Sequence, residues 1–410
     1  MDSVDSEREE RPPGGLPEGG GSSEETYYKT SDPRPHLMEF DSLRGIGILM
    51  VVMAHAGIVW RWTIGNDLPV PLLRIDLLDF FRMGYLAIPL FFLLSGYLLT
   101  WTEEGRKRRG SYSVLNYAKR RVLRIIPAYY VAIVVVILVW PSHPSFGAVA
   151  LHLTLLHGFK PSYPVGLDGA WWSLTPELVF YAMLPLLVLK FRKFWQRATI
   201  LGILLLVSLV TRLSMAYGVF SFLPVLNGFS GNRLYFFPTT LLYLCFVGVL
   251  LRMIVERYTK ADHELSRQQL FLASALTVVP IALLLVFNFL IMRPGPHRDN
   301  PVGLFAEAML ILAFASVLLG SPILKPVLKL RPLVFLGEMS YSFFLLHNTI
   351  ILMVFAPILA VTAPWLADQS ELTMWATFFA YASGILAVAG GLAYLSYRYI
   401  ESPFMRIKPK

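Results

Sequence analysis

The sequence predicts an all-α integral membrane protein, with about ten transmembrane helices in one bundle and a short re-entrant or interfacial helix. The 410 residues are 55% hydrophobic and 15% charged, whereas soluble domains average roughly 25% charged residues. The apolar residues also occur in runs close to the ~20 residues that a helix needs to cross the hydrocarbon core. This composition excludes an ordinary soluble enzyme, a disordered chain and a disulfide scaffold.

Ten apolar runs predict the membrane spans. Pro and Gly interrupt several of them, which membrane helices tolerate better than soluble ones. The stretch 146–158 is shorter and predicts the re-entrant or interfacial helix. The ten predicted spans are 43–60, 83–101, 123–140, 175–189, 198–217, 234–251, 270–292, 303–320, 333–356 and 372–397.

The first 36 residues differ from the rest of the chain. They are rich in Glu, Asp, Pro, Gly and Ser and show no apolar period. Such a segment cannot bury enough surface to offset the entropy of ordering, so 1–36 is predicted to be a disordered tail. The remaining residues, 37–406, are predicted to form a single transmembrane domain.

The distribution of Lys and Arg predicts the orientation. If the first helix begins at the cytoplasm, the loops on that side hold 23 Lys and Arg, against 8 on the opposite side. This asymmetry predicts a multi-pass protein of the cell membrane with both termini in the cytoplasm. The net charge is +9, but the basic residues fall between apolar runs, so nucleic acid is not a predicted partner.

The first predicted helix carries two ionisable residues, Arg44 and His55. Such residues are rare and costly inside a membrane, so each is a candidate functional residue. Eleven helical steps place His55 about 16 Å deeper than Arg44. A neutral imidazole at that depth accepts a proton near neutral pH. The alternative reading of His55 is a histidine whose hydrogen bonds a neighbouring helix satisfies.

A basic cluster precedes the third span. Arg121 and Arg124 lie three residues apart, which places them on one face of a helix. Guanidinium groups at this spacing suit phosphate groups. The alternative reading is a charge run that sets topology and meets anionic lipid, and for Lys119 and Arg120 that reading is preferred.

Two further candidates lie toward the outer side. Glu177 follows Thr175 and Pro176, which are suited to a helix start with Thr175 as the cap. Glu177 is therefore either a charge at a helix N-terminus or a carboxylate that orients a catalytic imidazole. His347 lies ~21 Å above the start of a helix that begins at 333. His55, Glu177 and His347 thus share the outer half, but no close ligand pair supports a metal site.

Six motifs, taken in order, resemble the acyltransferase 3 family of membrane O-acyltransferases. The resemblance covers nearly all of 37–406, without an appended esterase-like domain. Pro176 and Ser402 depart from residues that are common in the family. The motifs are Phe40–Ile48 with His55 ten intervening residues after Arg44, Ile88–Tyr97, Arg120–Pro127, Trp172–Glu177, Ser340–His347 and Tyr399–Phe404.

The resemblance implies transfer of an acyl group, most often acetyl, from acyl-CoA to a hydroxyl of a sugar, glycan or secondary metabolite. It implies no permanently bound cofactor, with acyl-CoA as donor substrate. Arg44 and His55 fill the family's Arg–His pair, Arg121 and Arg124 its donor-associated motif, and Glu177 its acidic position. His55 is the expected base, oriented by Glu177 or His347.

Two alternatives stay open at the level of sequence. A multi-pass transporter or exporter of a small molecule or glycan precursor would also carry polar groups at depth. Within the enzyme class, an acyl-enzyme route through His55 or Ser95 competes with direct transfer. Ser95 is the weaker carrier because the sequence shows no base adjacent to it.

Overall fold

The computed structural model describes residues 37–65, 68–70, 75–140, 144–160, 166–217, 238–258, 266–290 and 303–407. The chain divides into two units, Met1–Leu37 and Met38–Lys410. The predicted tail, 1–36, lies outside the described residues. The account that follows concerns the second unit alone.

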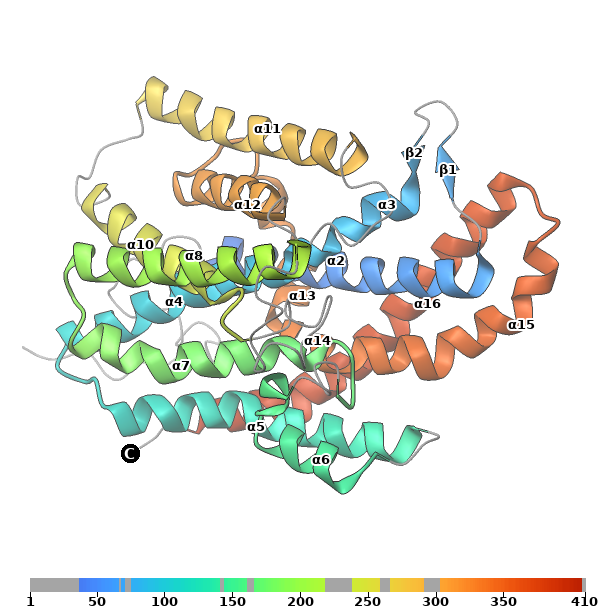
Figure 1. Cartoon of the computed structure of the whole chain (residues 1–410), viewed down its shortest axis with the longest axis horizontal. Helices are drawn as coiled ribbons and strands as arrows, with labels where there is room; N and C mark the ends of the chain where they lie inside the picture. The colour runs from blue at the N-terminus through green and yellow to red at the C-terminus, as the bar shows by residue number, and fades with distance from the viewer. Residues whose placement is uncertain are drawn as a thin grey trace, which may run out of the picture. The chain divides into compact units, whose positions relative to one another are not determined.

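The second unit is helical, as predicted (Figure 1). Its helices of eight or more residues are α2 (Leu37–Ile64), α4 (Ala87–Arg108), α5 (Val114–Val139), α6 (Phe146–Leu153), α7 (Leu174–Leu189), α8 (Phe194–Tyr217), α10 (Leu242–Tyr258), α11 (Arg267–Leu290), α12 (Gly303–Leu318), α13 (Arg331–Glu338), α14 (Ser340–Ile350), α15 (Ala356–Leu366) and α16 (Glu371–Ser396).

Shorter elements connect these helices. They are the helices α3 (Leu77–Arg82) and α17 (Ser402–Arg406), the 3₁₀ turns η1 (Met83–Leu86), η2 (His157–Phe159), η3 (Trp171–Ser173) and η6 (Val327–Lys329), the π-helical segments η7 (Ile351–Phe355) and η8 (Tyr397–Glu401), and the strands β1 (Pro69–Val70) and β2 (Ile75–Asp76). The two strands pair antiparallel, with Pro69 opposite Asp76. This small hairpin is the one addition to the predicted helical class among the described residues.

Eight helical segments in the described part of the chain are long and apolar enough to cross a membrane. They are Met38–Ile64, Leu77–Arg108, Val114–Val139, Trp171–Leu189, Phe194–Ser214, Arg267–Asn288, Ser340–Leu366 and Glu371–Arg406. The other two predicted spans, 234–251 and 303–320, correspond to α10 and α12, which have 17 and 16 residues. The protein is therefore a multi-pass integral membrane protein. The predicted span 234–251 begins too early, because α10 starts at Leu242.

The bounds predicted for the ninth span, 333–356, are wrong. The short helix α13 ends at Glu338, and the chain starts a new helix at Ser340 that runs through η7 to Leu366. Gly337 lies in the last turn of α13, where a Cβ would lie 1.8 Å from the Asp41 carbonyl oxygen. The glycine lets α13 pack directly on the backbone of α2. His347 is thus seven residues into α14, or about 10 Å from its start.

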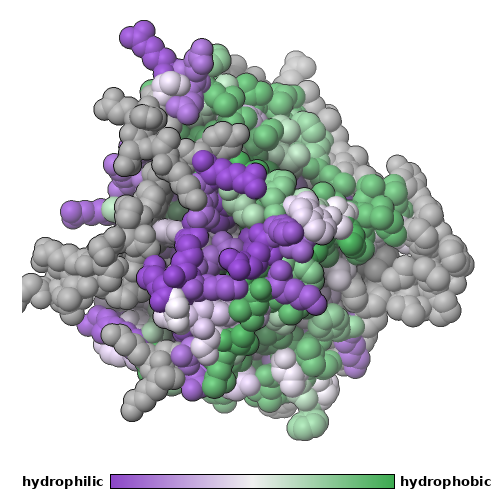
Figure 2. Space-filling view, turned by 90° about the vertical axis from the view of Figure 1, so that its left-hand side faces the viewer, coloured by the Kyte–Doolittle hydropathy of each residue, from purple (hydrophilic) through white to green (hydrophobic). Residues whose placement is uncertain are grey.

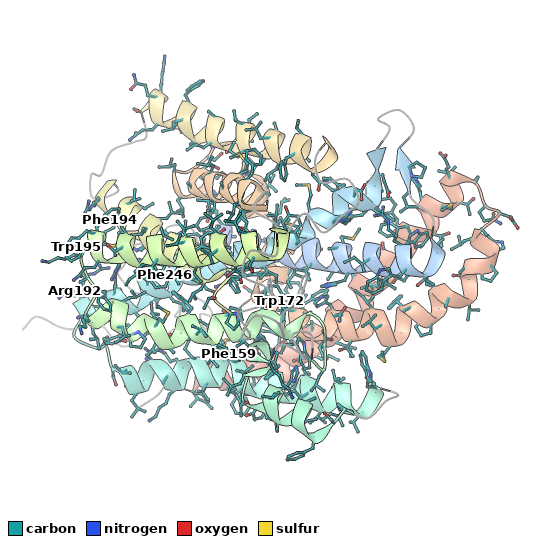
Figure 3. All side chains as sticks on the ribbon, viewed as in Figure 1. Phe159, Trp172, Arg192, Phe194, Trp195 and Phe246 are labelled. Atoms are coloured by element: carbon teal, nitrogen blue, oxygen red, sulfur yellow. The ribbon has the colours of Figure 1, made fainter. Side chains whose placement is uncertain are left out.

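Charged side chains at the ends of α4 and α10 and at the start of α8 lie at one end of the bundle. Arg108 at the end of α4 pairs with Glu256 at the end of α10, at 2.8 Å. Arg197 of α8 pairs with Glu104 of α4, at 2.5 Å. Hydrophilic side chains gather on this end in Figure 2. Figure 3 shows Arg192 there beside the start of α8. The ends of α4 and α10 and the start of α8 therefore lie together, as the charge distribution predicts for these three loops.

Candidate active site

Two of the predicted residues, His55 of α2 and His347 of α14, are in direct contact. The Nδ1 atom of His55 lies 3.1 Å from Nε2 of His347. The two rings are 5.1 Å apart and tilted by 42°. Nearly 300 residues of sequence separate the pair, so the helix packing brings them together. His347 is fully buried, whereas His55 is half-buried.

The backbone decides which nitrogen of each ring carries a proton. The Nδ1 atom of His347 lies 2.7 Å from the carbonyl oxygen of Phe344. Because a carbonyl oxygen accepts only, Nδ1 of His347 carries the proton and its Nε2 accepts. Nδ1 of His55 must then donate to His347, so Nε2 of His55 carries the lone pair. This arrangement makes Nε2 the basic atom of His55.

Arg44 lies on α2, toward its start. Its guanidinium donates to the Asp41 carboxylate at 2.8 Å, and 24% of its side chain is exposed. Arg44 and Arg124 of α5 are close enough to interact electrostatically. The structure thus brings two of the three arginines predicted for the donor to one region of the bundle.

Arg121 and Arg124 share the side of α5 that faces α7. The Arg121 guanidinium lies over the rings of Tyr117 and Tyr181, at 6.0 and 5.9 Å from their centroids. Arg124 interacts electrostatically with Glu177 and Tyr181 of α7. The expected common face is therefore confirmed. By contrast, Arg120 pairs with the buried Glu103 at 2.8 Å, consistent with a structural role.

Glu177 has partners other than those the sequence suggested. Its Oε1 atom accepts hydrogen bonds from the Ser95 hydroxyl at 3.1 Å and from the Tyr181 hydroxyl. The structure therefore joins His55 to His347, and it joins Glu177 to Ser95 and Tyr181. It also corrects the expectation that Ser95 lacks an adjacent base, because the two residues lie on α4 and α7 and meet only in the folded bundle.

Thr175 does not cap α7 as predicted. It lies inside the helix, and its hydroxyl donates to the Leu155 carbonyl at 2.8 Å and accepts from the Gly158 N–H at 3.2 Å. A Cβ at Gly158 would lie 2.8 Å from the Thr175 side chain, so glycine allows this approach. Through these two hydrogen bonds, Thr175 links the segment after α6, which includes η2, to the start of α7.

Glu401 belongs to the last of the six motifs but is not among the predicted site residues. The π-helical segment η8 places this carboxylate at the end of α16, where it is 1% exposed and accepts a hydrogen bond from Ser342 at 2.7 Å. It also interacts electrostatically with Arg44 and Arg124. Extra residues of this π type in helices often occur at functional sites. The signal available in the sequence was an acidic residue inside the last motif.

Asp168 is likewise not among the predicted site residues. It lies before η3, is 1% exposed, and accepts hydrogen bonds from Asn348 at 2.9 Å and Thr349 at 2.6 Å. Those two residues directly follow His347 on α14. A lone Asp in a loop before the Trp171–Trp172 pair carries no pattern that marks it. Among the described residues, no group of three or more His, Cys, Asp or Glu is arranged to hold a metal ion.

The family model described as an acyltransferase domain matches residues 38–394 of this chain. The match covers most of the chain and includes all six predicted site residues. The chain therefore belongs to the acyltransferase 3 family.

Three relatives illustrate what the chain is similar to. The peptidoglycan O-acetyltransferase OatA of Listeria monocytogenes is 23% identical over 391 residues, or 91% of this chain and 56% of the relative. The O-acetyltransferase OatA of Staphylococcus aureus is 22% identical over 402 residues, or 92% of this chain and 58% of the relative. A putative acetyltransferase of Acidianus two-tailed virus is 27% identical over 331 residues, or 78% and 84%. The chain spans less than two thirds of both bacterial relatives. No solved structure matches it.

Proposed function

We propose that the protein transfers an acyl group, most often acetyl, from acyl-CoA to a hydroxyl group of a glycan. The observation that carries this proposal is the His55–His347 contact, which leaves a basic nitrogen on a half-buried imidazole inside the bundle. The names of the two bacterial relatives, both O-acetyltransferases and one of them a peptidoglycan O-acetyltransferase, support acetyl as the group and a glycan as the acceptor.

In the proposed reaction, Nε2 of His55 acts as the general base. It takes the proton of the acceptor hydroxyl while the oxygen attacks the thioester carbonyl carbon. The tetrahedral intermediate then collapses, the C–S bond breaks, and the CoA sulfur takes the proton back from His55. The products are an O-acyl ester and free CoA. His347 acts as a positioning residue, because its Nε2 holds Nδ1–H of His55 and thereby fixes the tautomer.

Arg44, Arg121 and Arg124 are proposed to bind the phosphates of the donor. Arg44 lies three helical turns from His55, about 16 Å along α2. The extended pantetheine arm of CoA spans that interval, with the phosphates at the arginines and the thioester toward the histidines. The electrostatic proximity of Arg44 and Arg124 supports this, because two guanidinium groups held together favour a polyanion.

We place the basic end of the bundle in the cytoplasm, with both chain termini on that side. The excess of Lys and Arg in the loops of that end supports this orientation. Acyl-CoA then reaches the arginines from the cytoplasm. The acceptor reaches His55 from the opposite side, where the segment containing η3 packs.

The proposal is tested with the purified full chain in lipid nanodiscs. Release of CoA from acetyl-CoA is measured with solubilised peptidoglycan fragments as the acceptor probe. We expect release to depend on the fragments, and to be lost in His55→Gln, whose amide keeps a contact with His347 but cannot take a proton. Fragment-dependent release that persists in the folded His55→Gln protein would exclude His55 as the base.

The Ser95–Glu177 hydrogen bond makes an acyl-enzyme route a specific second possibility. In that route the Ser95 oxygen attacks the thioester, Glu177 takes its proton, and CoA leaves before the acceptor arrives. Labelled acetyl-CoA without acceptor separates the two routes. Label retained by the wild-type chain and absent from Ser95→Ala indicates the acyl-enzyme. Unlabelled wild-type protein that still turns over with acceptor indicates direct transfer.

A further inference from the structure

Asp168 is a buried carboxylate whose hydrogen-bond partners in the described part of the chain are all neutral donors. Its Oδ1 atom accepts from the Ala170 N–H at 2.8 Å and from the Asn348 side chain at 2.9 Å. Its Oδ2 atom accepts from the Thr349 hydroxyl at 2.6 Å. Burial raises the pKa of Asp168, and these three donors oppose that effect. Both oxygens therefore act as acceptors, which is the pattern of an ionised carboxylate.

The segment that carries Asp168 holds α14 on both sides of His347. Asn348 and Thr349, the partners of Asp168, directly follow the histidine. On the other side, the indole N–H of Trp171 donates to the Leu345 carbonyl at 3.0 Å. Asp168 also interacts electrostatically with His55. A displacement of this segment would consequently move His347 relative to His55.

The charge of Asp168 matters most while the reaction proceeds. The three groups that donate hydrogen bonds to Asp168 are neutral, so they surround the carboxylate with dipoles rather than with a positive charge. When His55 takes the acceptor proton, the pair gains a positive charge. An electrostatic interaction that strengthens only at that stage lowers the barrier rather than the energy of the bound substrate.

We propose that Asp168 is a positioning residue that supplies the counter-charge for the imidazolium formed on the His55–His347 pair. It does so from outside the reacting atoms, through its electrostatic field, while Asn348 and Thr349 hold the carboxylate in place. The inference rests on the proposed role of His55 as the base. It assigns to Asp168 the orienting role that the sequence suggested for Glu177.

The other titratable groups that face Asp168 remain neutral in the working range. Tyr129 of α5 and His152 of α6 both interact with it electrostatically. His152 donates from Nδ1 to the Ala148 carbonyl and accepts at Nε2 from the Leu167 N–H, so its tautomer is fixed. Burial lowers the pKa of His152. His157 stacks on His152 at 4.1 Å, and burial lowers its pKa to about 3. Protonation near Asp168 at neutral pH is thus left to the catalytic pair.

The first test needs no acyl donor. The full chain is treated with diethylpyrocarbonate over a range of pH, and modification of His55 is measured by mass spectrometry of its peptide. In Asp168→Asn we expect the pH midpoint of His55 modification to fall by about one unit, because the imidazolium loses its counter-charge. Asp368→Asn, which changes an exposed carboxylate between α15 and α16, should leave the midpoint unchanged. An unchanged midpoint in folded Asp168→Asn would overturn the proposal.

A second variant separates charge from structure. Thr349→Val removes one hydrogen bond to Asp168 but keeps the carboxylate, so its midpoint should stay within experimental error of the wild type. If Thr349→Val and Asp168→Asn shift the midpoint equally, the role of Asp168 is structural. If Asp168→Asn does not fold, Asp168→Glu replaces it. That variant keeps the charge and should keep the midpoint, and a fall of about one unit there contradicts the proposal.

The rate provides the third readout. With acetyl-CoA and peptidoglycan fragments, we expect kcat of Asp168→Asn to fall about a hundredfold, with KM for acetyl-CoA changed less than about twofold. In the dependence of kcat on pH, the acidic limb should shift to lower pH by the same amount as the His55 midpoint. If the midpoint shifts in Asp168→Asn but the wild-type chain releases no CoA, the counter-charge role stands and the acyl-CoA reaction is rejected. If the wild-type chain releases CoA but the midpoint is the same in Asp168→Asn, the acyl-CoA reaction stands and the counter-charge role is rejected.

Discussion

Two clusters of polar side chains lie inside the bundle, and they differ in exposure and in charge balance. Arg44 and Asp41, near the predicted donor site, are 24% and 26% exposed. Arg212 of α8 and Glu307 of α12 are 0% and 1% exposed, and one Arg212 nitrogen contacts both carboxylate oxygens at 2.7 and 3.0 Å. The hydroxyl of Tyr243 on α10 donates to the same carboxylate. The second cluster thus pairs its charges internally and links three helices.

The comparison shows that an ionisable residue in a membrane span is a functional candidate only until its partners are known. Arg212 and Glu307 satisfy the sequence criterion as well as Arg44 and His55 do, because all four lie in apolar helices. The pair on α8 and α12 meets its hydrogen-bonding needs within the protein and serves packing. The half-buried residues on α2 and α5 keep some surface that a substrate can reach.

The largest expected effect is at His55. His55→Ala should lower fragment-dependent acetyl transfer about a thousandfold, because a general base contributes that order of rate. The measurement is CoA release, with thermal unfolding in parallel. We expect the melting temperature to fall only modestly, because the substitution removes one hydrogen bond to the buried Nε2 of His347. A melting temperature that falls as far as that expected for Arg212→Met, described next, would show that His55 is a packing residue.

Arg212→Met should destabilise the bundle by about 3–5 kcal/mol, because it leaves the Glu307 carboxylate buried without its cation. Activity per folded molecule should stay unchanged. The double variant Arg212→Met/Glu307→Gln should recover most of the stability, since the amide keeps a contact for Tyr243. Stability is measured by denaturation in mixed micelles. If the single variant loses turnover while it remains folded, the two clusters are coupled and the distinction between them fails.

Arg124→Lys tests whether the arginines bind the donor. A lysine keeps the charge but loses the planar guanidinium, so KM for acetyl-CoA should rise about tenfold with a smaller change in kcat. The rise should be smaller for dephospho-CoA thioesters, which carry fewer phosphate charges. Lys119→Arg, an exposed neighbour on the same helix, is the control and should change neither constant. A loss confined to kcat would instead place Arg124 in the chemical step.

Ser342→Ala should have the smallest effect. It removes the hydroxyl that donates to the buried Glu401 at 2.7 Å, at a cost of about 1–3 kcal/mol in the free energy of unfolding. We expect KM for acetyl-CoA to rise modestly as well, because Glu401 interacts with both Arg44 and Arg124. A variant with lower stability and unchanged KM would show that Glu401 supports the fold without organising the arginines.

The sequence by itself determined the class of fold and the approximate position of most helical spans. These depend on apolar runs and on the placement of Lys and Arg, which are local properties of the chain. The motifs also selected His55, His347, Arg44, Arg121, Arg124 and Glu177, although their chemical roles stay predictions. The break between α13 and α14 was not predicted, because the apolar run 333–356 continues across it.

Only the tertiary structure decided which of these residues are partners. His55 and His347 meet because α2 and α14 pack together, and Ser95 meets Glu177 because α4 and α7 do. Asp168 lies in a loop and Glu401 lies in a π-helical segment. Neither of these elements has a periodic signal in the sequence. Hydrogen bonds act over about 3 Å, whereas sequence patterns constrain a helix only along its own axis and face. The pairing of side chains from different helices is therefore settled by packing.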